Sequence, residues 1–104
     1  MTRQCDVFAN PDAEEAVQRP YLIVLQSDLI SGLRSIVVAP LVVRASLDGA
    51  SRLNPIIKIE GEEFWLAVHE LFAVDQRILR RKVASLPQQR DEIVSAIDFL
   101  FTGF

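Results

Sequence analysis

The first three quarters of the chain alternate short apolar runs with turn signals, a pattern that is typical of antiparallel strands. Residues 21–25 are rich in β-branched and aromatic side chains and too few for a helix, so they predict a buried strand. Further strands are expected at residues 5–8, 35–44, 56–59, 62–68 and 74–79. The pattern therefore predicts a mainly β fold.

Glycine and proline mark where these strands turn or are interrupted. Gly61 lies between two expected strands and tolerates a positive φ, so it predicts a tight hairpin. Pro40 lies inside the expected strand 35–44 and lacks an N–H, which predicts a sheet edge, a bulge or a bend there. Residues 10–19 begin with Asn, Pro and Asp and predict a turn within a long hairpin loop.

The last part of the chain has a helical period instead. Ser85 is a candidate N-cap, Gln88 is its capping-box partner, and Pro87 suits the first turn. Apolar residues then recur at helical spacing on one face. This stripe consists of Ile93, Ala96, Ile97, Leu100, Phe101 and Phe104. We therefore expect an amphipathic α-helix after the strands.

Thr102, Gly103 and Phe104 end this stripe and allow two interpretations. In the first, Gly103 caps the helix in the left-handed region and Phe104 folds back onto the core. In the second, the tip is an exposed or dimer-facing apolar surface, because chain termini normally lie at the surface. The residues by themselves favour the packed interpretation.

Composition and charge narrow the class of protein. Of the 104 residues, 50% are apolar and 24% are charged, which suits one domain over residues 1–104 that buries roughly two-thirds of its unfolded surface. The net charge of −3 lacks the excess of Lys and Arg that phosphate binding needs, so direct, specific nucleic-acid binding is not expected.

The cellular compartment follows from the cysteine content and the apolar runs. The single Cys5 cannot form an internal disulfide, as is usual in a reducing compartment. Residues 1–10 lack the apolar stretch of a signal peptide, and no run approaches the ~20 residues of a membrane span. We expect a cytoplasmic protein without a membrane partner.

The residue types that carry catalysis or bind metals are few and scattered. His69 is the only histidine, so a site with several imidazole ligands is excluded and a structural role is expected. Members of the pairs Glu14-Glu15 and Glu62-Glu63 would point to opposite faces of a strand, which suits solvated side chains better than a carboxylate dyad. No Gly-rich phosphate loop is present. We therefore predict no catalytic residues, no metal and no cofactor.

Four segments, in order along the chain, carry a resemblance to a known family. Residues 24–30 (VLQSDLI) are similar to its V-x-V-Q-S-D segment with two hydrophobic residues after it, and residues 36–41 (IVVAPL) to its V-I-P-L strand. Residues 53–59 (LNPIIKI) are similar to Y-P-x-x-H-I, and residues 96–104 (AIDFLFTGF) to the terminus A-I-N-x-x-F-W-G-I. From about residue 5 to residue 104 the chain thus resembles CcdB, the toxin of CcdA/CcdB toxin–antitoxin modules.

The resemblance implies a fold, an activity and partners. The fold would be an SH3-like barrel of antiparallel strands with a C-terminal amphipathic α-helix, assembled as a homodimer. The activity would be that of a non-enzymatic poison, which binds the DNA gyrase A subunit and traps the cleaved gyrase–DNA complex. A CcdA-like antitoxin would neutralise it, as in modules for plasmid maintenance.

The resemblance also implies which residues bind gyrase. The positions that match are the terminal contacts Thr102, Gly103 and Phe104, the supporting Asp98 and Phe101 on the same helix, and the apolar loop pair Leu29 and Ile30. Thr102 departs from the family pattern, which has Trp at this position. Loss of such a large flat anchor would weaken the gyrase contact by a few kcal/mol.

Two other functions remain open. The Thr102 departure motivates a non-toxic homologue that only binds the antitoxin, as its partner or as a co-repressor. The barrel also resembles that of MazF-type endoribonucleases, in which case His69 or a carboxylate would serve as general base. The basic cluster Arg77, Arg80, Arg81 and Lys82 would then bind RNA or an acidic antitoxin tail, unless it is simply a charged strand edge that discourages aggregation.

Overall fold

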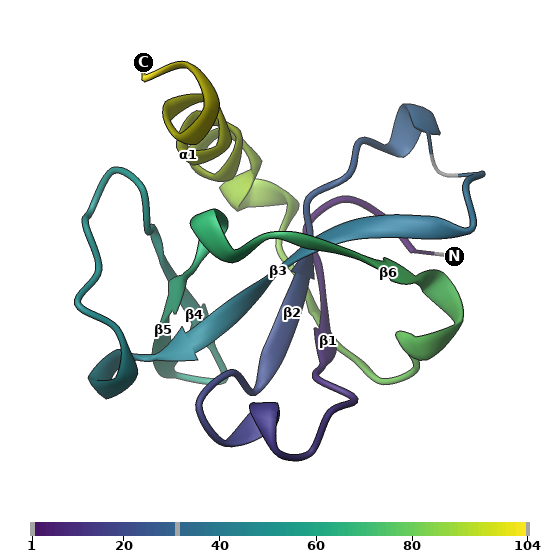
Figure 1. The fold of residues 1–104 in the computed structure, drawn as a ribbon, viewed down its shortest axis with the longest axis horizontal. Coiled ribbons are helices and arrows are strands. Elements are labelled where there is room, and N and C mark those ends of the chain that lie inside the picture. Colours follow the sequence, from purple (N-terminus) through teal and green to yellow (C-terminus); the bar gives the residue numbers. More distant parts are fainter. Residues whose placement is uncertain (1, 31, 104) are drawn as a thin grey trace.

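The computed structural model describes residues 2–30 and 32–103 (Figure 1). In this part of the chain the strands are β1 (Asp6–Ala9), β2 (Tyr21–Val24), β3 (Ser35–Val43), β4 (Ile56–Ile59), β5 (Glu62–Leu66), β6 (Phe72–Asp75) and β7 (Lys82–Ser85), and the helix is α1 (Arg90–Thr102). The predicted order of strands followed by one helix is confirmed.

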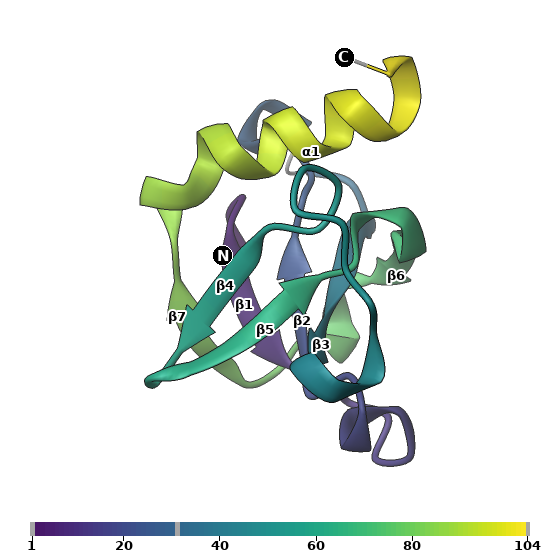
Figure 2. The same cartoon turned by 90° about the vertical axis from the view of Figure 1, so that its left-hand side faces the viewer.

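All strand pairs are antiparallel and form one curled sheet. The strand order is β4-β5-β3-β2-β1-β7, and β6 pairs with β3 beside this path. The sheet curls into a half-barrel, and α1 lies across one end of it (Figure 2). This arrangement confirms the mainly β, SH3-like fold with a C-terminal helix.

Pro40 lies where the long strand β3 changes neighbours. Along one edge β3 pairs with β2, and Pro40 is opposite Leu22. Along the other edge the pairing with β6 ends at Val38 and the pairing with β5 begins at Leu41. A residue without an N–H is tolerated at this changeover, because on that side Pro40 only has to accept: its carbonyl receives the N–H of Ala67 at 3.0 Å. The expected interruption is therefore real, although it lies inside the sheet.

The hairpin between β4 and β5 has the predicted tight turn. Ile59 is opposite Glu62, and only Glu60 and Gly61 connect them. Both residues have a positive φ, at 52° and 84°, which is the geometry of the two-residue turns that match the twist of a hairpin.

The strand predicted at residues 74–79 is wrong in its bounds. β6 starts earlier, at Phe72, and ends at Asp75. The Asp75 carboxylate then accepts a hydrogen bond from the backbone N–H of Arg77 and starts a single 3₁₀ turn, Gln76–Ile78. A short polar side chain that binds the backbone ahead of it competes with strand pairing. The strand β7, which follows at the sheet edge, was not predicted as a separate element.

The capping box predicted for the helix is also wrong. Ser85 is the last residue of β7, and its hydroxyl donates to Asp6 Oδ1 at 2.9 Å. A 3₁₀ turn, Pro87–Gln89, comes next, and α1 begins at Arg90 without a side-chain cap. The Ser85 hydroxyl, which the local pattern predicts as a helix cap, is therefore bound to Asp6 on another strand.

The apolar stripe of α1 packs on the barrel core over most of its length. Ile93 and Ala96 are fully buried, and Ile97 and Leu100 pack against the same cluster. That cluster includes Val7, Ile23, Leu41, Ile57, Phe64 and Leu66 from five strands. Phe101, in contrast, is 69% exposed, so the stripe leaves the core in the last turn. Phe104 lies outside the described residues.

The opposite face of the sheet holds a smaller core. Its buried members are Phe8, Leu22, Val24, Ile36, Val38 and Leu79. No helix of the described residues is both long and apolar enough to cross a lipid bilayer.

Candidate functional site

The last turn of α1 ends in a glycine cap. Gly103 has φ 79°, in the left-handed region, and its N–H donates to the carbonyl of Phe99 at 3.0 Å. The hydroxyl of Thr102 donates to the carbonyl of Asp98 at 2.6 Å. The first bond satisfies a carbonyl of the last helical turn, and the second adds a side-chain donor to a carbonyl within the helix. The glycine cap of the packed interpretation is therefore present.

The side chains around this cap nevertheless face outward. Asp98, Phe101, Thr102 and Gly103 are all exposed. A phenylalanine that is 69% exposed keeps most of its ring in water, so it is available to a partner surface. The described part of the tip is an exposed surface, and Phe104, which was predicted to belong to it, is outside the described residues.

A loop from the sheet supports the same end of α1. The guanidinium carbon of Arg52 lies 4.5 Å from the centre of the Phe99 ring, which is a cation–π contact. Figure 2 shows the segment between β3 and β4 reaching up to the helix. The helix end therefore rests on the core through its stripe and on this loop through Phe99.

Trp65 packs against the first part of the β3–β4 loop, at Arg44 and Gly49. Arg44 lies over the indole at 4.5 Å from its centre, and the indole N–H donates to the Arg44 carbonyl at 3.3 Å. A Cβ at Gly49 would overlap the same ring, so only glycine permits this close approach. Trp65 therefore packs against this loop.

The second predicted patch, Leu29 and Ile30, lies in a 3₁₀ turn, Asp28–Ile30. The side chain of Leu29 is 95% exposed. The turn is fixed by its polar neighbours: the N–H of Gln4 donates to Asp28 Oδ1 at 2.7 Å, and Gln26 Nε2 donates to the Ile30 carbonyl at 3.0 Å. An apolar side chain held outward in this way is available for binding.

The two patches are not adjacent. Gln4, which holds the Asp28 turn, also accepts a hydrogen bond from Arg90 Nε at 3.0 Å, at the first residue of α1. Thr102 is at the other end of this helix, roughly 18 Å away at a rise of about 1.5 Å per residue. The described residues among those predicted therefore form two patches near opposite ends of α1, Leu29 and Ile30 near its start and the last helical turn at its end.

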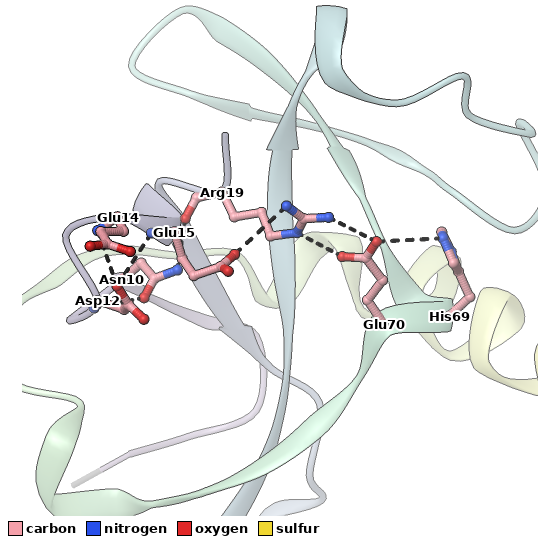
Figure 3. A network of polar contacts seen from close by, with 7 residues as sticks. All are labelled: Asn10, Asp12, Glu14, Glu15, Arg19, His69 and Glu70. Carbon is pink, nitrogen blue, oxygen red and sulfur yellow. Dashed lines mark hydrogen bonds and ion pairs between the residues drawn. The ribbon is translucent and has the colours of Figure 1, made fainter. Parts of the chain in front are cut away.

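A cleft on the side of the molecule away from α1 was not predicted. It has a volume of about 590 Å³ and lies between the β1–β2 loop and the segment of β6. Its lining comprises Asn10, Pro11, Asp12, Glu15, Arg19, Leu22, Pro40, Glu70, Phe72, Val74 and Ile78. Figure 3 shows the polar side chains at its wall.

An ion pair joins the two walls of this cleft. Arg19 donates from Nε to Glu70 Oε1 at 2.8 Å and from Nη2 to Glu70 Oε2 at 3.1 Å, and Glu15 Oε2 lies 3.7 Å from its Nη1 (Figure 3). These hydrogen bonds lower the pKa of Glu70 and raise that of Arg19. Glu70 is thus an ionised carboxylate bound to a cation, which makes it a weak general base.

His69 lies beside this pair and has its own partner. Its Nδ1 is 3.1 Å from Asn54 Nδ2, and its Nε2 is 4.0 Å from Glu70 Oε2. Because an amide N–H can only donate, Nδ1 is the acceptor and Nε2 carries the proton. Asn54 is buried and also binds the Leu66 carbonyl, so this contact fixes the imidazole. His69 has the structural role predicted for it.

Two of the four basic residues predicted as a cluster at residues 77–82 form ion pairs with acidic residues. Arg77 binds Asp75 at 2.8 Å, and these bonds lower the pKa of Asp75. Lys82 Nζ lies 3.4 Å from Oδ1 of Asp6, a fully buried carboxylate. Arg80 and Arg81 are exposed. Half of the predicted cluster is therefore occupied in holding β6 and β7 in place.

Sequence reasoning missed Arg19, Glu70 and Asp6. Arg19 and Glu70 are 51 residues apart, and no spacing along the chain indicates that they meet. The acidic residue next to His69 was the one local signal. In the described residues, no group of three or more His, Cys, Asp or Glu side chains is arranged to hold a metal ion.

Comparisons with known proteins give both a family and a fold. The family model described as CcdB protein matches residues 4–103. No curated protein is similar in sequence at a significant level.

Three solved structures illustrate the fold. An endoribonuclease in complex with its cognate antitoxin, from Mycobacterial species, superimposes with a TM-score of 0.76 at 8% identity, over 96% of this chain and 94% of that one. The Mycobacterium tuberculosis toxin MazF-mt6 gives 0.70 at 15%, over 95% and 96%. MazE-MazF from Deinococcus radiodurans gives 0.68 at 16%, over 98% and 95%. At these identities the likeness concerns the fold alone.

Proposed function

Because this chain belongs to the CcdB protein family, we propose that it is the toxin of a toxin–antitoxin module that binds the DNA gyrase A subunit. It stabilises the cleaved gyrase–DNA complex by binding and performs no chemistry of its own. A CcdA-like antitoxin neutralises it. The observation that carries the proposal is the exposed last turn of α1, which presents Phe101, Thr102 and Gly103, three of the residues that match the family's gyrase contacts.

The tip binds through a small apolar surface on a fixed helix end. Thr102, Gly103 and Phe104 make the terminal contacts, and Phe101 and Asp98 support them. Full burial of one phenylalanine side chain is worth about 1.5–3 kcal/mol, so Phe101, at 69% exposed, is a substantial part of this contact. The Gly103 cap and the Arg52–Phe99 contact hold the turn before the partner arrives, which lowers the entropic cost of binding.

Thr102 makes this tip a weaker anchor than a tryptophan would be. Its hydroxyl already donates to the Asp98 carbonyl. Only its methyl group is therefore left to contact gyrase. Tryptophan, tyrosine and arginine are the residues that most often dominate binding interfaces. The toxin therefore depends on Phe101 and Phe104 for affinity.

The active form is a homodimer with two-fold symmetry, which presents two tips to the two-fold gyrase A dimer. Leu29 and Ile30 form a second contact near the other end of α1. The exposure of Leu29, at 95%, supports this role, because its side chain is available to a partner surface.

An endoribonuclease is less well supported than a gyrase poison. Cleavage of RNA needs a free base and cations for the phosphates, whereas Glu70 is bound to Arg19 and the imidazole of His69 is held by Asn54. Arg77 is bound to Asp75. The carboxylates Asp12 and Glu15 line the cleft beside these groups and repel phosphate.

Two incubations test the proposal. Purified protein with gyrase, ATP and supercoiled plasmid gives linear DNA after denaturation if the chain is a gyrase poison. The same preparation with RNA leaves the RNA intact. RNA fragments without linear plasmid would instead support the endoribonuclease, and inactivity in both assays would support a homologue that only binds antitoxin.

A further inference from the structure

The cleft of about 590 Å³ has no part in the proposed gyrase contact. Figure 1 shows the β1–β2 loop at the end of the molecule opposite α1. The cleft lies between this loop, β3 and β6. Three independent features suit it to bind a ligand: an apolar floor, a charged rim and an open strand edge.

The floor is apolar and partly exposed. Leu22 and Pro40 form its buried base. Phe72 and Ile78 are 43% and 41% exposed and flank Val74, so apolar area of the cleft is in contact with water. Covering this area with an apolar side chain would stabilise a complex.

The rim carries excess negative charge. The lining residues include three carboxylates, Asp12, Glu15 and Glu70, and a single cation, Arg19, which gives a net charge of −2. Arg19 is already bound by Glu70 and Glu15. A cation in the ligand is therefore favoured, and a phosphate is repelled.

The acidic rim is fixed in shape before any ligand binds. The backbone N–H groups of Glu14 and Glu15 donate to Asp12 Oδ1 at 3.0 and 3.3 Å. Asn10 Oδ1 in turn accepts from the N–H of Asp12 at 3.0 Å (Figure 3). Such turns fix the loop backbone that carries the carboxylates, and pre-organisation reduces the cost of binding.

The third feature is the edge of β6. Among the described strands, β6 pairs with β3 alone. Val37 of β3 accepts from Leu25 N on the β2 side, so by strand alternation Ile36 and Val38 face β6. The register then places the N–H and C=O of Ala73 at the outer edge, next to the cleft. An extended segment could pair there.

From these features we infer that the cleft is a docking site for an extended, cationic segment of a partner protein. The segment pairs with β6 at Ala73, inserts an apolar side chain over Leu22 and Val74, and directs a Lys or Arg to Asp12 and Glu15. The inference is independent of the gyrase proposal, because it rests on a different surface.

A blocked hexapeptide is a suitable probe. It carries leucine, lysine and arginine at alternate positions separated by alanines, and its matched control has glutamate in place of both basic residues. Binding is followed by amide shifts in ¹H–¹⁵N NMR spectra of the full chain. The cationic peptide shifts the amides of Ala73 and Glu15, with saturation, and the glutamate peptide does not.

Substitutions in the cleft test whether its charge and its strand edge bind the peptide, and thermal unfolding checks that each variant is folded. The double substitution D12N/E15Q keeps the side-chain size and weakens the cationic peptide about fivefold or more, as the loss of two partly exposed charge contacts predicts. Ala73→Pro removes the outward N–H at an edge that tolerates proline and also weakens binding. The control E62Q/E63Q, in β5, leaves binding unchanged. Unchanged thermal unfolding shows that each variant is folded.

Several results would overturn the inference. Equal binding of both peptides, or no saturable shift up to millimolar peptide, would exclude a cationic docking site. Displacement of the peptide by an oligouridylate, with shifts at the same amides, would make the cleft a nucleic-acid site. Shifts of these amides on dilution alone would make it an interface between copies of this chain.

Discussion

The guanidinium carbon of Arg52 lies 4.5 Å from the centre of the Phe99 ring, and this contact joins the β3–β4 loop to α1. Phe99 is also the residue whose carbonyl accepts the N–H of the Gly103 cap. One aromatic residue thus connects the loop to the turn that carries the proposed gyrase contacts.

Substitution of Arg52 tests this support. Arg52→Ala removes a contact worth about 0.5–1 kcal/mol at an exposed site. We expect hydrogen exchange of the Thr102 and Gly103 amides to accelerate, with little change in global unfolding. Arg44→Ala, which removes the matching contact on Trp65, should leave exchange in α1 unchanged. Equal protection in the wild type and R52A would mean that the loop does not hold the helix end.

Asp6 provides a second prediction, about stability. Its buried carboxylate accepts from Ser85 Oγ and the Arg3 N–H at 2.9 Å each, and Lys82 Nζ lies 3.4 Å away. Asp6→Ala leaves these groups without their acceptor, so urea unfolding should show a loss of about 2–4 kcal/mol. Ser85→Ala removes one hydrogen bond and should cost about 1 kcal/mol. Similar midpoints for D6A and the wild type would contradict this account of how β1 and β7 are joined.

Glu70 predicts how stability depends on pH. Its hydrogen bonds from Arg19 lower the pKa of Glu70 in the folded protein below the ordinary 4.5. A carboxyl with a lowered folded pKa binds protons more readily when unfolded, so its contribution is complete above the ordinary pKa and is lost as pH falls below it. We expect Glu70→Gln to reduce the loss of stability below pH 4.5 in urea titrations. Glu62→Gln, on the exposed hairpin, is the control, and parallel curves for E70Q and the wild type would contradict the role of this pair.

Local features of the sequence predicted most of the strands and the hairpin. Residues 21–25 and Gly61 could be interpreted correctly, because burial of a short apolar run and a positive φ depend on few neighbours. The predicted apolar stripe of the helix packs on the core from Ile93 to Leu100. Its spacing alone defines this face, so no distant partner was needed to predict it.

Features that depend on distant partners could not be predicted. The hydroxyl of Ser85 binds Asp6, which is 79 residues away, instead of capping α1. The pairing of Arg19 with Glu70 depends on how β3 brings the β1–β2 loop and the turn before β6 together. For the residues proposed to bind gyrase, the family pattern supplied the positions, and the structure supplied the exposure and the division into two patches of those that it describes.

Introducing the tryptophan of the family pattern at position 102 tests whether this position contacts gyrase. Thr102→Trp adds a large flat surface to an exposed helix turn, and hot-spot residues are worth about 2 kcal/mol or more, which is roughly a thirtyfold gain in gyrase affinity. The protein concentration that gives half-maximal linear plasmid should fall accordingly. Thr102→Val is the control, since it removes the hydroxyl without adding an aromatic ring. If T102W needs as much protein as the wild type, this turn does not contact gyrase.

The most direct test of the central claim is the plasmid cleavage assay with Phe101→Ala. Phe101 is 69% exposed, so its removal should leave the free energy of unfolding nearly unchanged. Val17→Ala is the matched control, because Val17 is 76% exposed on the β1–β2 loop, away from α1. We predict that the wild type and V17A linearise plasmid in the presence of gyrase and that F101A needs at least tenfold more protein, the change expected for a loss of about 1.4 kcal/mol. Equal linearisation by F101A, or none by the folded wild type, would contradict the proposal that this helix end poisons gyrase.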